Sequence, residues 1–140
     1  MAAPKFVLDA SAAVALVRRE AGWDKVDGAT RRGATIAASN LAEAITTLKR
    51  RGHKATVAEL KSGFARLGLG VEDVTGDDVV RMSELLMLSD DLVAKGELER
   101  PVSLGDATCI AVAERLGLPV ICSDRAWDKL SVAVPVGQFR

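Results

Sequence analysis

The alternation of short apolar runs with longer helical stretches constrains this chain most. The apolar runs have the length of single strands and are Lys5–Leu8, Ala34–Ala38, Val71–Val74, Pro119–Cys122 and Val132–Val136. In the stretches between most of them, apolar residues recur every three or four positions, the period of an amphipathic helix. Strands separated by helices pair in parallel, and the helices cover both faces of the sheet. We therefore predict an α/β fold with a mainly parallel central sheet flanked by helices on both faces.

The expected helices follow from periodicity and from start and stop signals. They are Ser11–Val17, Trp23–Arg32, a helix opened by Ser39 and Asn40 that ends before Gly52, Ala55–Leu67, Asp77–Lys95, Ser103–Leu116 and a short one at Asp124–Leu130. Ser103–Leu116 has the clearest pattern. Trp23 and Trp127 lie on such helices, where we expect them to pack in the core.

Length and charge limit the classes of protein to which this chain can belong. The chain has 140 residues, 49% of them hydrophobic and 27% charged, which suits one globular domain over residues 1–140 that needs no disulfide staples. Nineteen Lys and Arg balance nineteen Asp and Glu, so no overall field attracts nucleic acid or anionic membrane. A polyanionic partner must therefore be held locally.

The cysteines and the apolar stretches indicate a reducing compartment. Cys109 and Cys122 cannot form a disulfide framework or a four-ligand zinc site, so we expect buried thiols. Ala10–Val17 is too short, and too poorly flanked by positive charge, for a signal peptide. No stretch approaches the roughly 20 apolar residues that cross a membrane. We expect a cytoplasmic protein without a membrane association.

Four acidic residues lie where helices are expected to start. Asp9 ends the first strand, Glu43 lies in the first turn after the second, Asp106 opens the clearest helix, and Asp124 follows the strand Pro119–Cys122. Each alone fits a helix cap, since acids are favoured there by the helix dipole. The Asn40/Glu43 and Ser103/Asp106 spacings both resemble capping boxes.

Taken together, the acids predict a metal site. Parallel strands end at one edge of a sheet, so three of these carboxylates should face one another there. Clustered carboxylates recruit a cation, and their oxygens suit Mg²⁺ or Mn²⁺. Asp106 shares a helix face with Cys109, Ile110 and Ala113, which indicates that it points inward. The face of Glu43 continues through polar residues, which favours a surface cap for it.

Five motifs resemble those of PIN domains, and more closely those of the VapC toxins of bacterial toxin-antitoxin pairs. The motifs are VLDASA at 7–12, SNLAE at 39–43, SLGD at 103–106, LGLPV at 116–120 and DRAW at 124–127. They occur in order over nearly the whole chain, and the stretch from 103 to 127 is the most specific part. The resemblance implies a single PIN-like domain.

The resemblance also implies an activity. PIN-family ribonucleases cut RNA with a divalent metal held by acids, which fall here on Asp9, Glu43, Asp106 and Asp124. We expect Asp9, Asp106 and Asp124 to bind Mg²⁺ or Mn²⁺, and Glu43 to act through water or as a general base. VapC toxins cleave structured RNA, often tRNA or a ribosomal RNA loop, are blocked by a cognate antitoxin and usually form homodimers.

Two positions depart from the family pattern. Cys122 stands where a threonine is common, and Ala107 stands where an arginine often follows the third aspartate. Ser11, Ser123 and Arg125 are therefore candidates for contacts with the substrate. A further acid, Asp128, lies one helical turn beyond Asp124 and is an alternative to it.

The basic residues allow more than one role, and three other functions compete with that of a ribonuclease. The basic run at 49–54 suits either phosphate contacts or an ordinary helix C-terminus. An aspartate-nucleophile phosphatase would need a second acid at Ser11, and a phospho-receiver domain would need an acidic pair where Leu8 and Ala10 flank Asp9. A metal-inactive PIN scaffold that binds RNA or a partner protein without cleavage is the remaining alternative.

Overall fold

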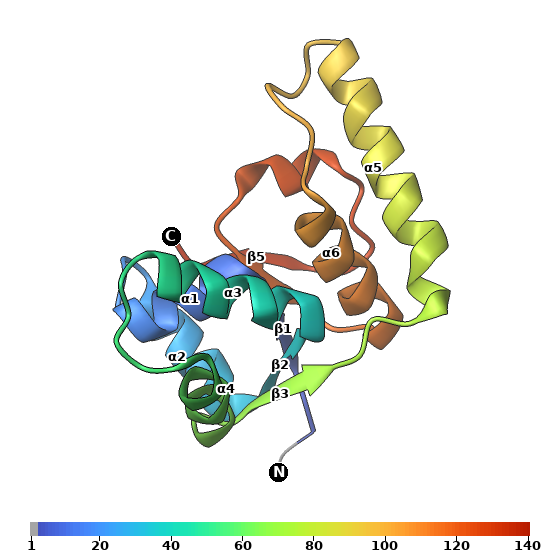
Figure 1. The fold of residues 1–140 in the computed structure, drawn as a ribbon. Helices are drawn as coiled ribbons and strands as arrows, with labels where there is room; N and C mark the ends of the chain where they lie inside the picture. The colour runs from blue at the N-terminus through green and yellow to red at the C-terminus, as the bar shows by residue number, and fades with distance from the viewer. Residues whose placement is uncertain (1–2) are drawn as a thin grey trace.

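A computed structural model describes residues 3–140 and contains one five-stranded parallel sheet. The sheet order is β3-β2-β1-β4-β5, and the α/β class and parallel pairing expected from the sequence are confirmed (Figure 1). The strands are β1 (Phe6–Leu8), β2 (Ala34–Ala37), β3 (Leu69–Glu72), β4 (Val120–Cys122) and β5 (Val136–Gln138).

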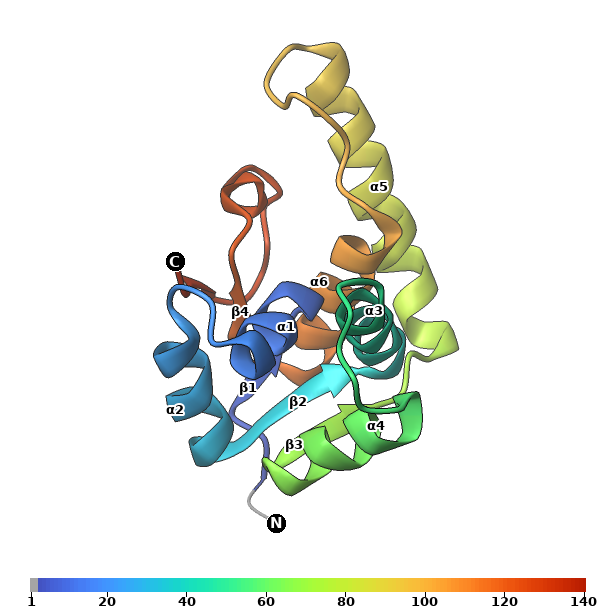
Figure 2. The ribbon, with the colours of Figure 1, turned by 60° about the vertical axis from the view of Figure 1, so that its left-hand side comes forward.

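Six α-helices and two short 3₁₀ turns connect the strands. They are α1 (Ala10–Arg18), α2 (Trp23–Gly33), α3 (Ala38–Arg50), α4 (Val57–Arg66), η1 (Gly76–Asp78), α5 (Val79–Ala94), α6 (Leu104–Leu116) and η2 (Arg125–Lys129). α5 extends beyond the sheet, and the following segment returns along it to α6 (Figures 1 and 2). Among residues 3–140, every helix is too short or too polar to cross a lipid bilayer.

The sheet separates two hydrophobic cores, as the alternation of side chains along β1 shows. Leu8 points into a core built with α1, α2, α3 and α4, and its neighbour Val7 points into a second core built with α5, α6 and η2. Trp127 is fully buried in the second core, as expected. Trp23 is only half-buried, with the guanidinium of Arg19 over its ring. The prediction of helices on both faces is confirmed.

The strand order places one crevice at the carboxyl edge of the sheet. The chain proceeds outward from β1 to β2 and β3, and then returns to place β4 on the other side of β1. The direction of winding therefore reverses between β1 and β4, and ligands of open parallel sheets bind at such a point. Asp9 follows β1 directly, and Ser123 follows β4.

Two of the expected strands were placed wrongly along the chain. β3 begins at Leu69, not Val71, because Gly68 reverses the chain with φ +92° and Leu69 then pairs with Ala34. Val71 is apolar but 49% exposed on this edge strand, so its hydrophobicity marks no core position. β5 begins at Val136, because the backbone N–H of Ala133 donates to Glu114 of α6 and takes no part in the sheet.

Candidate functional site

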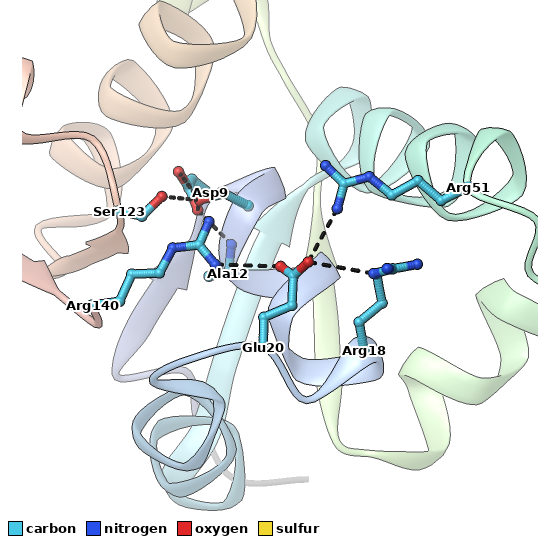
Figure 3. A network of polar contacts seen from close by, with 8 residues as sticks. Asp9, Ala12, Arg18, Glu20, Arg51, Ser123 and Arg140 are labelled. Carbon is cyan, nitrogen blue, oxygen red and sulfur yellow. Dashed lines mark hydrogen bonds and ion pairs between the residues drawn. The ribbon is translucent and has the colours of Figure 1, made fainter.

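Asp9 lies between β1 and α1 and is fixed by its neighbours. Its carboxylate caps α1 by accepting the N–H of Ala12 at 2.8 Å, and it accepts the Ser11 hydroxyl at 2.7 and 2.9 Å. The Ser11 hydroxyl also lies 3.1 Å from that of Ser123, so the ends of β1 and β4 are joined at this point (Figure 3). Asp9 can therefore cap α1 and still belong to the candidate site.

The environment of Asp9 disfavours its charge. Burial raises its pKa, and this effect outweighs the bonds from Ala12 and Ser11, which lower it. The negative charges of Asp106 and Glu43 raise it further, to about 7. The residue is only 7% exposed. A buried carboxylate with raised pKa beside other acids is a mark of a functional site.

Asp106 faces the same space from the start of α6. It forms a capping box with Ser103, as predicted, and each bond measures 3.1 Å. Burial raises its pKa against the effect of the Ser103 bonds, and the charges of Asp124 and Glu43 raise it further. The predicted inward stripe of α6 is confirmed, since Cys109, Ile110 and Ala113 are fully buried.

Glu43 reaches the site in a way that the sequence did not indicate. α3 begins at Ala38, so the predicted capping box of Asn40 and Glu43 is wrong, because Asn40 already lies inside the helix. Asn40 is buried, and its amide donates to Glu43 at 3.2 Å and to the Gly105 carbonyl at 3.0 Å. A Cβ at position 105 would lie 2.7 Å from Glu43 Oε1, so a larger residue there would displace the Glu43 carboxylate. Glu43 thus lies against the turn that carries Asp106.

Asp124 and its neighbours lie at the same carboxyl edge of the sheet. Asp124 caps η2 by accepting the N–H of Ala126 at 2.9 Å, and its charge acts on Asp106. Arg125 is exposed and donates to the carbonyl of Arg140 at 3.3 Å.

The two cysteines are buried thiols, as expected. Cys109 donates to the carbonyl of Leu8 and Cys122 to that of Asp124, both at 3.7 Å. Burial raises the pKa of Cys122 to about 12 and that of Cys109 well above its ordinary value, with nearby acids adding to the effect. Neither thiol is therefore a nucleophile at neutral pH.

A cleft of about 1000 Å³ brings most of the predicted site residues together. Its walls include Asp9, Ser11, Asp106, Ser123, Asp124 and Arg125. Glu43 lies on an adjoining cleft of about 210 Å³ that also contains Ser11. Asp128 is exposed on η2 and lines neither cleft. The topology thus gathers the acids that the sequence placed after strands and at helix starts.

The donor set suits a hard divalent cation. Within residues 3–140 no Lys, Arg or His forms an ion pair with Asp9, Glu43, Asp106 or Asp124. Over the same range, no three Asp, Glu, His or Cys side chains already stand in a metal-binding arrangement. Because no positive side chain in this range offsets their charges, the carboxylates repel one another, and a cation between them would relieve this repulsion.

The basic run at 49–54 is partly structural. Lys49 donates to the carbonyls of His53 and Ala55, both at 2.8 Å, which closes the end of α3. His53 accepts the N–H of Ala55, so the only histidine is used in a turn. Arg51 instead pairs with Glu20, a residue that the sequence patterns did not single out.

Comparisons with known proteins agree with this geometry. The PIN domain family model matches residues 6–133. No curated protein matches the chain. The DNA-bound VapBC structure from Salmonella typhimurium is 17% identical with a TM-score of 0.71, and the match covers 98% of this chain and 99% of that one.

Two further solved structures share the fold. VapBC2 from Rickettsia felis, bound to a DNA fragment from its promoter, is 12% identical with a TM-score of 0.70, covering 95% of this chain and 97% of that one. VapC20 from Mycobacterium tuberculosis, described as a toxin that cleaves the sarcin-ricin loop, is 21% identical with a TM-score of 0.69, covering 91% and 96%. Because the family model spans most of the sequence, the chain belongs to the PIN domain family.

Proposed function

We propose that this protein is a metal-dependent endoribonuclease and the toxin of a toxin-antitoxin pair. The observation that carries the proposal is the buried Asp9, which shares a cleft with Asp106 and Asp124 and has no cationic partner within residues 3–140. Burying an uncompensated carboxylate destabilises a fold, so a functional reason for it is favoured.

The acids divide into direct ligands and helpers. Asp9 and Asp106 are the residues that would hold Mg²⁺ or Mn²⁺ directly, and Asp124 would hold a second ion. When bound, such an ion activates water and neutralises charge on a phosphodiester. Glu43 would bind through water or accept a proton from the attacking water. The hydrogen bonds of Asn40 to Glu43 and to the Gly105 carbonyl support this role, since they hold the carboxylate beside the turn that carries Asp106.

The residues around the acids hold them in place. Ser11 and the Ala12 N–H orient both oxygens of Asp9, and Ser103 fixes one oxygen of Asp106. Ser123 and Arg125 line the cleft beside Asp124, where a phosphate and a ribose of the substrate would lie. These contacts limit the motion of the carboxylates and so reduce the reorganisation needed in the reaction.

Similarity to VapBC structures supports the toxin role and an antitoxin partner. VapC20 is described as cleaving the sarcin-ricin loop, which supports a structured RNA as substrate here. The resemblance to VapC toxins makes tRNA and ribosomal RNA the candidates. Several of the similar structures are toxin-antitoxin complexes, among them one from Klebsiella pneumoniae. From the resemblance of its motifs to those of VapC toxins we also propose a homodimer, and the buried thiols of Cys109 and Cys122 support a reducing compartment, the cytoplasm.

A metal-inactive scaffold is the second candidate. It is favoured by the finding that no three side chains in residues 3–140 already stand in a metal-binding arrangement. Such a protein would bind RNA or a partner equally well in EDTA and in Mg²⁺, and it would leave the RNA intact.

The test is cleavage of total cellular RNA by the purified protein with Mg²⁺, with Mn²⁺ and with EDTA. Asp106→Asn is compared with Asp90→Asn, a control on the exposed face of α5. We expect cleavage only with metal, its loss in Asp106→Asn and its retention in the control. Cleavage in EDTA, or undiminished cleavage by Asp106→Asn, would disprove the proposal.

Growth provides the test of the toxin role. Expression of the wild-type chain in bacteria should slow growth, and expression of Asp106→Asn at the same level should not. Equal growth of both strains would argue for an RNA-processing enzyme that is not a toxin.

A further inference from the structure

A single carboxylate, that of Glu20, is surrounded by three arginines next to the candidate site. Its oxygens lie 3.3 Å from Arg18 Nε, 3.1 Å from Arg51 Nη1 and 3.3 Å from Arg140 Nη1. Figure 3 shows the three guanidinium groups converging on Glu20 from the end of α1, from the residue that follows α3 and from the segment after β5. We call these four residues the Glu20 cluster.

The Glu20 cluster has an excess of positive charge. Within residues 3–140 none of its arginine side chains pairs with a second acidic side chain, so the four side chains of the cluster carry a formal charge of +2. The arginine side chains remain 42%, 48% and 38% exposed for Arg18, Arg51 and Arg140. A guanidinium carries five N–H donors in a fork that fits the oxygens of a phosphate. The cluster can therefore take an additional anion.

The position of the cluster links it to the site. Glu20, Arg51 and Arg140 line the cleft of about 210 Å³ whose walls also include Ser11 and Glu43. Ser11 bonds to Asp9 and also lines the larger cleft with Asp106 and Asp124. An anion bound by Arg51 and Arg140 would thus lie beside the proposed centre of reaction.

We propose that Arg51 and Arg140 bind a backbone phosphate of the RNA next to the one that is cleaved. Arg18 supports this subsite through Glu20, which keeps the like-charged guanidinium groups together in the free protein. The inference rests on the proposed ribonuclease function and adds residues that position its substrate. Since the net charge of the whole chain is zero, the protein needs a local excess of positive charge, such as that of the Glu20 cluster, to bind a polyanion.

A purely structural role predicts a different response to mutation. If the cluster only ties three segments together, loss of any member lowers stability and leaves RNA affinity unchanged in the folded protein. If it binds phosphate, Glu20→Gln raises the charge of the cluster from +2 to +3 and tightens RNA binding. The two roles therefore predict different changes in RNA affinity for Glu20→Gln.

The experiment measures binding of a labelled single-stranded RNA of mixed sequence by fluorescence anisotropy, in EDTA so that the RNA stays intact. Arg51→Gln and Arg140→Gln are compared with Arg31→Gln, which removes one positive charge at the far end of α2, before β2. We expect each cluster variant to bind roughly 5-fold more weakly and the salt slope to fall by about 0.7. We expect Arg31→Gln to match the wild type and Glu20→Gln to bind more tightly.

The outcomes separate this inference from the proposed function. Wild-type affinity in both arginine variants, weaker binding by a folded Glu20→Gln variant, or no RNA binding by the wild type would each overturn the inference. Metal-dependent cleavage with unchanged KM in Arg51→Gln would leave the ribonuclease proposal standing and remove the subsite. RNA that binds through the arginines but is never cleaved would remove the ribonuclease proposal and leave the arginines as a phosphate-binding site. Thermal melting of each variant identifies those that fail to fold.

Discussion

Asp9 and Asp78 are both buried aspartates, yet their surroundings are opposite. Asp78, in η1, accepts Arg115 Nε at 2.8 Å and the N–H of Thr75 at 2.9 Å. Burial would raise its pKa, but these bonds and the Arg115 charge outweigh burial and lower it. Asp9 is hydrogen-bonded as well, but burial raises its pKa more than these bonds lower it, and the charges of Asp106 and Glu43 add to the rise, to about 7.

The difference distinguishes a structural acid from a functional one. Asp78 is compensated within the chain and links η1 to α6 through Arg115, which also pairs with Glu72 at 3.1 Å. Asp9 lacks such compensation among residues 3–140, so its charge is available to a ligand. Both residues are shielded from solvent, but within the described residues only Asp78 has a cation beside it, and that cation helps to outweigh the effect of burial on its pKa.

The largest expected effect is on activity at Asp9. Asp9→Asn keeps the size of the side chain and an oxygen for the Ala12 N–H, but it removes the charge that would hold a metal. We expect RNA cleavage in Mg²⁺ to fall by about 10³-fold, with the fold retained by circular dichroism. Asp78→Asn is the matched control for a buried aspartate and should retain most activity while folded. Equal losses in the two variants would contradict the distinction.

The next effect is on stability at Asp78. Asp78→Asn leaves the Arg115 guanidinium without its main partner, and we expect the free energy of unfolding to fall by about 2 kcal/mol in urea titrations. This estimate is below that for a fully buried pair because Arg115 is 26% exposed. Unchanged stability would show that water and Glu72 replace the pair.

The pH dependence of stability tests the contrast between Asp9 and Asp78 from the side of Asp9. The pKa of Asp9 rises from its ordinary value of 3.8 to about 7 on folding, so the folded state binds a proton more tightly than the unfolded one. In EDTA the stability owed to this group is complete below pH 4 and is lost as the pH rises to 7. We expect the free energy of unfolding to fall progressively between those limits.

Asp9→Asn isolates that contribution. Its stability relative to the wild type should increase from pH 5 to pH 8 in EDTA, as thermal melting would show, while Asp90→Asn follows the wild type. Mg²⁺ should raise the melting temperature of the wild type at pH 8 and have little effect on Asp9→Asn. A constant difference between wild type and Asp9→Asn across this range would show that Asp9 titrates near its ordinary pKa.

The sequence was sufficient to predict the edge of the sheet at which the acids meet. Asp9 and Asp106 were predictable because strand ends and helix caps are encoded within three or four residues, and parallel pairing then brings those ends together. Periodicity likewise predicted the buried stripe of α3, in which Leu41 and Ala44 lie in the core.

Contacts between distant segments were not predictable. Asn40 was expected to cap its own helix, but packing of α3 on α6 turns its amide toward Gly105, 65 positions away. Glu20 collects arginines from segments up to 120 positions away, and no local pattern marks such a cluster. β5 was misplaced for a similar reason, since Glu114 of α6 holds the backbone of Ala133 away from the sheet.

The smallest expected effect decides between Asp124 and Asp128. Asp124 lines the cleft and its charge acts on Asp106, whereas Asp128 is exposed on η2 and lies outside the cleft. We expect Asp124→Asn to lower cleavage about 10-fold, since water can partly replace an exposed ligand, and Asp128→Asn to change it less than about 2-fold. Rates in rising Mg²⁺ check the cause, because a weakened metal site is partly rescued by excess ion. A larger loss in Asp128→Asn would mean that η2 rearranges when RNA binds, and that the acid facing the cleft in the free protein is not the one used in the reaction.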